Sequence, residues 1–114
     1  MYCLYNAGAL SRHCVKAIMH IAVLTVEFAL HGNDSLKGKR RVANSIKQKV
    51  RNQFNVAVAE AGTHDSLTRL RLAVVSLSNE GGHLRNRMDK CLLMLEAVCP
   101  EEMVHSELEF FVTE

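Results

Sequence analysis

The order in which two hydrophobic periods follow one another constrains this chain more than any other feature. From residue 21 to residue 30 an apolar face alternates with a second face that carries Thr25 and Glu27. The apolar face comprises Leu24, Val26, Phe28 and Leu30. A period of two residues is that of a β-strand, so this segment is predicted to be a strand.

The next segment, residues 35–54, changes to the period of a helix. Its apolar side chains fall on one stripe at about 100° per residue, which predicts an amphipathic helix packed on a core. The stripe consists of Val42, Ala43, Ile46, Val50 and Phe54. Ser35 is suited to cap the start of this helix, because its hydroxyl can accept a hydrogen bond from a free backbone N–H.

The rest of the chain repeats both periods. Alternation returns in residues 55–62 and 66–78, a helical stripe follows over residues 82–98, Pro100 ends it, and residues 103–114 alternate again. The second stripe consists of Leu84, Met88, Cys91, Leu95 and Val98. Strand, helix, strand, strand, helix, strand is the split βαβ order, so we expect an α+β ferredoxin-like fold with a four-stranded antiparallel sheet and two helices on one face.

The first 18 residues show neither period, unlike the remainder of the chain. We interpret residues 1–18 as an N-terminal extension, either mobile or the product of a mis-assigned start, because Met19 directly precedes the first strand pattern. Residues 19–114 would form a single domain, a suitable size for one core. No stretch reaches the roughly 18 apolar residues that cross a membrane, so we expect no membrane partner.

The cysteine pattern bears on the cell compartment. Cys3, Cys14, Cys91 and Cys99 contain no C-x-x-C pair, and the apolar run "AIMHIAVLTV" has no cleavage site of a secretory signal. We therefore expect reduced thiols and a cytoplasmic protein.

The sheet face that the helices leave uncovered is predicted to be mostly polar and to carry both signs of charge. It would display Thr25, Glu27, Arg69, Arg71, His105, Glu107, Glu109 and Phe111. A face of this kind can remain hydrated or pair with a partner.

The charge distribution is uneven along the chain. The segment "SLKGKRRVANSIKQKVRNQF", residues 35–54, holds seven lysines and arginines and no acidic residue. Since the net charge of the whole chain is only +2, the remainder sums to −5. After Lys90 the chain has no further cation and only glutamates carry charge, so one part of the surface should attract anions and another repel them.

The cations of the first helix are predicted to share its outward face. At helical spacing this face holds Lys37, Arg40, Arg41, Asn44, Lys47 and Arg51, and we take these six residues as candidate RNA- or anion-binding residues. Arg40 and Arg51 would lie about 16 Å apart along the axis, enough to meet two or three successive phosphates. Lys39 differs, because it falls on the apolar stripe, where we expect its stem to pack and its amine to reach solvent.

Residue types that could support chemistry are present without a convincing arrangement. His64 next to Asp65, with Glu60 nearby, suits a turn better than acid–base catalysis. Histidines and cysteines lack metal-ligand spacing, and Cys91 and Met88 fit the core. We therefore expect no enzyme, no catalytic residue, no metal and no cofactor.

Four segments resemble the YlxP-like family of small bacterial proteins, a domain of unknown function. They are "SLKGKRR", "FNVAVAE", the Asp65 motif "DSLTR" and "VVSLSN". The resemblance covers about residues 19–114 and implies a ferredoxin-like fold without assigned catalytic residues. Genes of this family often lie beside translation-factor and ribosome-maturation genes, which implies a connection with RNA or the ribosome. Gly38 stands where relatives often have an acid, and Leu67 where they often have tryptophan.

Two hypotheses from different classes arise. The first is a non-enzymatic accessory protein that binds RNA, or a ribosomal particle, through the cationic face of the first helix. The second is an interaction or regulatory module that forms a homodimer, through the outer sheet face or through the acidic last strand meeting the basic helix of a neighbour. Light scattering at low and high salt would separate the two kinds of dimer.

Overall fold

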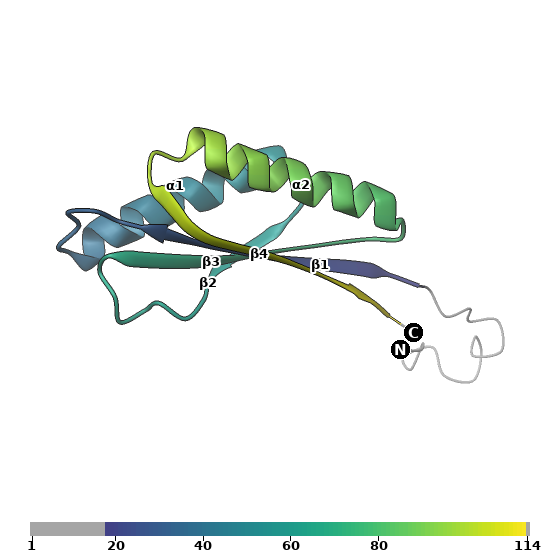
Figure 1. The fold of residues 1–114 in the computed structure, drawn as a ribbon, viewed down its shortest axis with the longest axis horizontal. Coiled ribbons are helices and arrows are strands. Elements are labelled where there is room, and N and C mark those ends of the chain that lie inside the picture. Colours follow the sequence, from purple (N-terminus) through teal and green to yellow (C-terminus); the bar gives the residue numbers. More distant parts are fainter. Residues whose placement is uncertain (1–17, 114) are drawn as a thin grey trace, which may run out of the picture.

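The computed structural model describes residues 18–113, and its elements follow the predicted order (Figure 1). They are β1 His20–Ala29, α1 Leu36–Gln53, β2 Ala57–Glu60, β3 Arg69–Ser78, α2 Gly81–Val98 and β4 Glu102–Val112. Apart from Ile18, the proposed extension at residues 1–18 lies outside the described residues, so it stays a prediction.

The four strands form one antiparallel sheet in the order β2-β3-β1-β4, which places β2 and β4 at opposite edges. Both helices cover the same face of this sheet, and the other face has no covering element among residues 18–113 (Figure 1). The ferredoxin-like α+β fold is therefore confirmed.

The core lies between the helices and the inward side of the sheet. It contains the alternating residues of β1 and β3 and the two helical stripes; its largest side chains include Leu24, Phe28, Ile46, Leu70, Leu72, Leu84, Met88 and Leu95. Val98, expected in the second stripe, is 48% exposed, and Cys99 is buried in its place. The reason is that α2 ends at Val98 and the extended backbone at Cys99 turns the next side chain inward.

The start of α1 is capped as predicted. Ser35 Oγ accepts a hydrogen bond from the backbone N–H of Gly38 at 3.0 Å. The first turn contains no acidic residue, and a side chain at Gly38 would collide with the amide of Asn33. That amide donates to the carbonyl oxygens of Ser35 and Leu67, so Asn33 joins the β1–α1 turn to the β2–β3 loop.

The uncovered sheet face differs from the expectation that it is mostly polar. Glu27, Arg71 and His105 lie side by side on it as expected, but the rows nearer the start of β1 are mainly apolar. Their polar members are Thr25, Glu107 and Glu109, and their apolar members are Ile21, Val23, Ala57, Ala59, Ala73, Val75, Leu77 and Phe111. The expected set included Phe111 but left out the other apolar positions of this face, and the strict alternation of β1 and β3 brings Ile21 and Leu77 onto it.

Candidate functional site

The outward surface of α1 carries the cationic residues that the sequence singled out. Lys37, Arg40, Arg41 and Asn44 are exposed, and Lys47 is half-buried. None of these four cations takes part in an ion pair within residues 18–113. Their charges are therefore not compensated by a neighbouring carboxylate, and they remain free to attract an anion.

Arg51 is part of the same surface but has a structural partner. Its guanidinium Nη2 donates a hydrogen bond to the carbonyl oxygen of Val58 at 3.0 Å. The contact joins the last turn of α1 to the edge strand β2. Arg51 keeps its charge near the surface, yet a substitution there would also remove this hydrogen bond.

The glutamates of β4 do not neutralise the cations of α1. The strand order sets β4 at the edge of the sheet opposite β2, and α1 is joined to β2 through Arg51. Glu102 is instead paired with His31, with 2.7 Å between its Oε1 and the imidazole Nε2. Within residues 18–113, no glutamate of β4 forms an ion pair with a cation of α1.

Further cations line a groove at the end of α1 and the first half of α2. It has a volume of about 370 Å³ and is lined by Phe54, His83, Asn86, Arg87 and Lys90. The guanidinium of Arg87 is fixed in the wall, because Nη1 donates to Ser76 Oγ at 2.7 Å. The groove escaped the sequence analysis because its lining joins the end of α1 to the first half of α2. The spacing of His83, Arg87 and Lys90, which lie on one side of α2, was the signal that could have indicated it.

Lys39 was set apart from the six candidate residues, and the prediction that its amine reaches solvent was wrong. Its side chain is 2% exposed, and its amine does not reach solvent. The Nζ atom donates to the carbonyl oxygens of Thr63 and of Ser66, the latter at 2.6 Å, and lies 3.1 Å from Glu60 Oε2. Because the β2–β3 loop folds over this position, it supplies oxygen partners inside the protein, and a buried lysine requires such partners.

The contacts of Lys39 organise the whole β2–β3 loop, residues 61–68. The N–H of Arg71 donates to Thr63 Oγ1 at 2.9 Å, and Ser66 Oγ accepts from the backbone N–H groups of Thr68 and Arg69. This loop contains the first four residues of the "DSLTR" segment, and the ammonium group of Lys39 connects it to α1. The arrangement is structural, since every polar atom of the lysine is used inside the protein.

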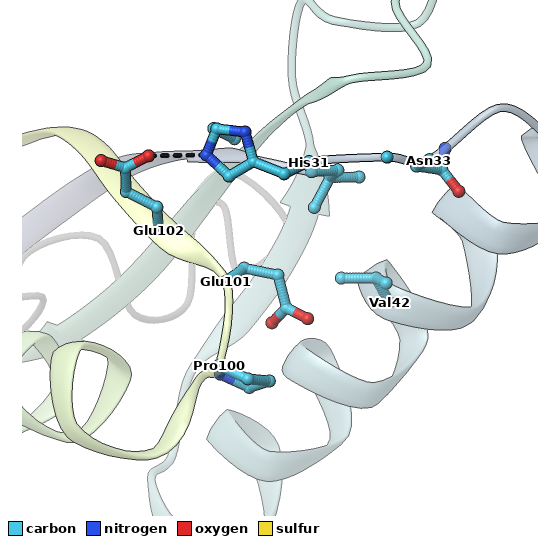
Figure 2. Close-up of a pocket in the computed structure, with 9 residues that line it drawn as sticks. His31, Asn33, Val42, Pro100, Glu101 and Glu102 are labelled. Carbon is cyan, nitrogen blue, oxygen red and sulfur yellow. Dashed lines mark hydrogen bonds and ion pairs between the residues drawn. The ribbon is translucent and has the colours of Figure 1, made fainter.

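A second cavity lies where β1 ends and β4 begins (Figure 2). It has a volume of about 410 Å³ and is lined in part by His31, Asn33, Val42, Glu101 and Glu102. Figure 2 shows Glu102 turned toward His31, whereas Glu101 points toward Val42. Among residues 18–113, no three His, Cys, Asp or Glu side chains are grouped closely enough to hold a metal ion.

The residues considered for acid–base chemistry do not form an active site. The carboxylate of Glu60 is occupied by Lys39, while His64 and Asp65 are exposed in the β2–β3 loop. The Cys91 thiol is buried among core side chains, and this burial raises its pKa to about 11. A thiol with a raised pKa is a poor nucleophile.

Fold and site together define a small α+β domain of the ferredoxin-like class with an uncompensated cationic helix. A family model described as "Protein of unknown function (DUF503)" matches residues 21–108, so the chain belongs to the DUF503 family. It is 26% identical over 85 residues to the "Uncharacterized protein YlxP" of Bacillus subtilis (strain 168), a match that spans 75% of this chain and 92% of that protein. The resemblance noted in the sequence is confirmed.

Solved structures with a similar fold have low sequence identity. Protein SO0527 of Shewanella oneidensis is 11% identical, with a TM-score of 0.48 over 86% of this chain and 93% of that one. A putative antibiotic biosynthesis monooxygenase from Nitrosomonas europaea is 9% identical, with a TM-score of 0.42 over 87% and 91% of the two chains. These likenesses carry no argument about function. No helix among residues 18–113 has both the length and the apolar character required to cross a membrane.

Proposed function

We propose that this protein is a non-enzymatic accessory protein that binds RNA, free or within a ribosomal particle, through the cationic face of α1. The observation that supports the proposal best is the set of exposed cations on α1 without a carboxylate partner in residues 18–113. An ordinary surface helix carries acids three or four positions from its lysines and arginines, and α1 has none. The gene neighbourhood that the family resemblance implies favours RNA over other polyanions.

The contacts would be made mainly to phosphates. Lys37, Arg40, Arg41 and Lys47 offer charge along the helix, and Arg51 adds to it at the far end. The uncovered sheet face lacks the aromatic pair by which RNA-recognition sheets stack bases, since its central strands carry Ala73 and Val75 at the matching positions. Recognition would therefore depend on backbone charge and shape, with little discrimination between sequences.

A pair of matched variants tests this proposal. Arg40→Glu and Lys49→Glu change the net charge equally, and both side chains are exposed. A separation of nine residues at ~100° each puts Lys49 on the opposite side of α1 from Arg40. Fluorescence anisotropy with labelled single-stranded and duplex RNA should show a loss of affinity of about tenfold or more for Arg40→Glu and a much smaller loss for Lys49→Glu. Equal losses would point to a general charge effect and contradict the proposal.

The strongest variant combines Lys37→Glu, Arg40→Glu and Lys47→Glu, and it leaves Arg51 unchanged because of its bond to Val58. It should abolish RNA binding while the thermal unfolding temperature stays within a few degrees of the parent protein, because the apolar stripe is untouched. Retention of binding by this triple variant would exclude α1 as the binding surface.

Salt dependence gives a second readout. If about four phosphates are contacted, the logarithm of the binding constant should fall with the logarithm of salt concentration at a slope of about −3 to −4. Arg40→Gln should make this slope shallower by about 0.7 to 0.9. Gradient sedimentation of cell extract at two salt concentrations extends the test to ribosomal particles, from which the protein should dissociate on adding salt. Binding that is insensitive to salt, or absent at low salt, would rule the proposal out.

A further inference from the structure

The uncovered face of the sheet is mainly apolar at one end and charged at the other. At one end the rows hold Ile21 and Val23 on β1 with Val75 and Leu77 on β3. Glu109 on β4 pairs with Val23, so the apolar patch is bounded by a carboxylate at the β4 edge. Leu77 is 57% exposed, and Phe111 in the same row is 49% exposed. Both helices lie on the other side of the sheet, so nothing among residues 18–113 covers these side chains (Figure 1). A contiguous apolar patch of this kind marks an interaction surface.

The other end of the same face is charged and ordered. Glu27 on β1 lies directly opposite Arg71 on β3. The Arg71 guanidinium donates to Glu27 Oε1 through both Nε and Nη2, at 3.0 and 2.8 Å, and Arg69 donates to the second carboxylate oxygen at 3.3 Å. The two central strands thus carry opposite charges at the same level. The next row holds Thr25 and Ala73, and the two rows beyond it are apolar on both strands.

We propose that this face packs against the same face of a second copy of the chain, to form a two-fold symmetric dimer whose axis runs along the strands between β1 and β3. Such an axis lays β3 of one copy over β1 of the other at the same level. Leu77 then meets Ile21 of the second copy, and Val75 meets Val23. At the charged end Arg71 of one copy meets Glu27 of the other. In each of these rows, the β3 residue of one copy therefore meets a β1 residue of the other copy with matching chemistry.

The size and geometry of the face suit this occupant. Four strands spaced at ~4.8 Å, three of them about ten residues long at ~3.3 Å per residue, cover roughly 500 to 600 Å² as a flat surface. Because side chains roughen the surface, the accessible area lost by each copy is larger, and specific interfaces begin at about 1,200 Å² for both partners together. Two sheets whose mean strand directions are nearly aligned also pack well face to face.

Leu77→Glu and Leu93→Glu test the inference as a matched pair. Both leucines are well exposed, at 57% and 65%, but Leu77 lies on the open face and Leu93 on α2. Light scattering of the full chain should give twice the 12.8 kDa chain mass for the parent protein and for Leu93→Glu, in low salt and in 1 M salt alike. Leu77→Glu should raise the dimer dissociation constant about 100-fold or more, since each copy places one glutamate in the apolar contact.

Other outcomes would overturn the inference. A monomeric parent protein, or a dimer equally sensitive to both substitutions, would exclude the open face. A dimer that dissociates in 1 M salt would instead indicate pairing of the acidic β4 with the basic α1 of a neighbour. Should Leu77→Glu fail to fold, as judged by circular dichroism, Phe111→Ser in the same row provides the replacement and should also weaken the dimer.

A charge swap tests the position of the axis. In the double variant with Glu27→Arg and Arg71→Glu, residues 27 and 71 still carry opposite charges. The ion pair between them is therefore kept within each copy, and so is the contact between two copies that both carry the double substitution. Mixed with the parent protein, however, it would bring like charges together at both contacts. Mass spectrometry of a mixture of differently tagged chains should therefore show both homodimers and depleted heterodimer. A statistical proportion of heterodimer would contradict the proposed axis. Because no RNA is present, failure here leaves the RNA proposal unaffected.

Discussion

Lys39 on α1 and Glu60 at the end of β2 form an ion pair inside the protein, with 3.1 Å between Nζ and Oε2. The lysine is 2% exposed and the glutamate side chain 21%. Two loop carbonyl oxygens complete the surroundings of the ammonium group. Removal of the lysine is costly, because it leaves a partly buried carboxylate and two loop carbonyl oxygens without their hydrogen-bond donor.

Lys39→Ala should therefore lower the free energy of unfolding by about 3 kcal/mol or more. Lys37→Ala, on the same turn but exposed, should change it by less than about 0.5 kcal/mol. Urea denaturation of both variants measures the difference. Hydrogen exchange should also become faster in residues 61–68 of Lys39→Ala and stay unchanged in Lys37→Ala. Equal stability of the two variants would show that the buried contacts of Lys39 contribute nothing.

The cap of α1 gives a second prediction. Ser35→Ala removes the acceptor of the Gly38 N–H and should lower the free energy of unfolding by about 1 kcal/mol. Ser45→Ala is the control, because Ser45 is exposed in the middle of the same helix, where alanine is the better helix former and should leave stability unchanged or slightly higher. Thermal unfolding of the three proteins would reveal the contrast. A loss in Ser45→Ala equal to that in Ser35→Ala would remove the capping explanation.

The buried thiol of Cys91 predicts a dependence of stability on pH. Burial raises its pKa from 9.0 to about 11 in the folded protein, while the unfolded chain keeps the ordinary value. The folded state therefore holds its proton more tightly, so the contribution is complete below pH 9 and is lost as the pH rises toward 11. The loss should be on the order of 2 kcal/mol by pH 11.

Urea unfolding at pH 8 and pH 10.5 checks this prediction in the parent protein and in Cys91→Ala. The variant starts from lower stability because it leaves a cavity in the core, but it should lose less between the two pH values than the parent does. Other groups titrate in both proteins, so the difference between the two losses isolates Cys91. Identical losses would be incompatible with a raised pKa of this thiol.

The fold could be predicted from the sequence because its periods are strong and local. The alternation of Leu24, Val26 and Phe28 fixes which face of β1 is buried, and the stripe through Ala43, Ile46 and Val50 fixes the orientation of α1. Ser35 indicated the start of α1 because a capping side chain bonds to a backbone N–H only three residues further along the chain. The exposed cations of α1 were predictable too, since a helix wheel requires no knowledge of the rest of the chain.

The features that escaped prediction all involve contacts between segments far apart in sequence. The surroundings of Lys39 depend on a loop more than 20 residues away, and the loop carbonyl oxygens leave no trace in the sequence pattern. The groove at Phe54 and Arg87 needs two helices to be placed side by side. The apolar rows of the open face result from the register of β1 with β3, in which Ile21 pairs with Leu77.

The strand order sets the acidic edge at β4 on the side opposite β2, next to which α1 presents its cations. A molecule built in this way has a permanent dipole moment across its sheet. Close to any large polyanion the field would turn the protein before contact, with β4 facing away and α1 facing inward. The distribution of charge would thus favour one orientation of the protein as it approaches the polyanion, and fewer encounters would occur in an orientation that cannot bind.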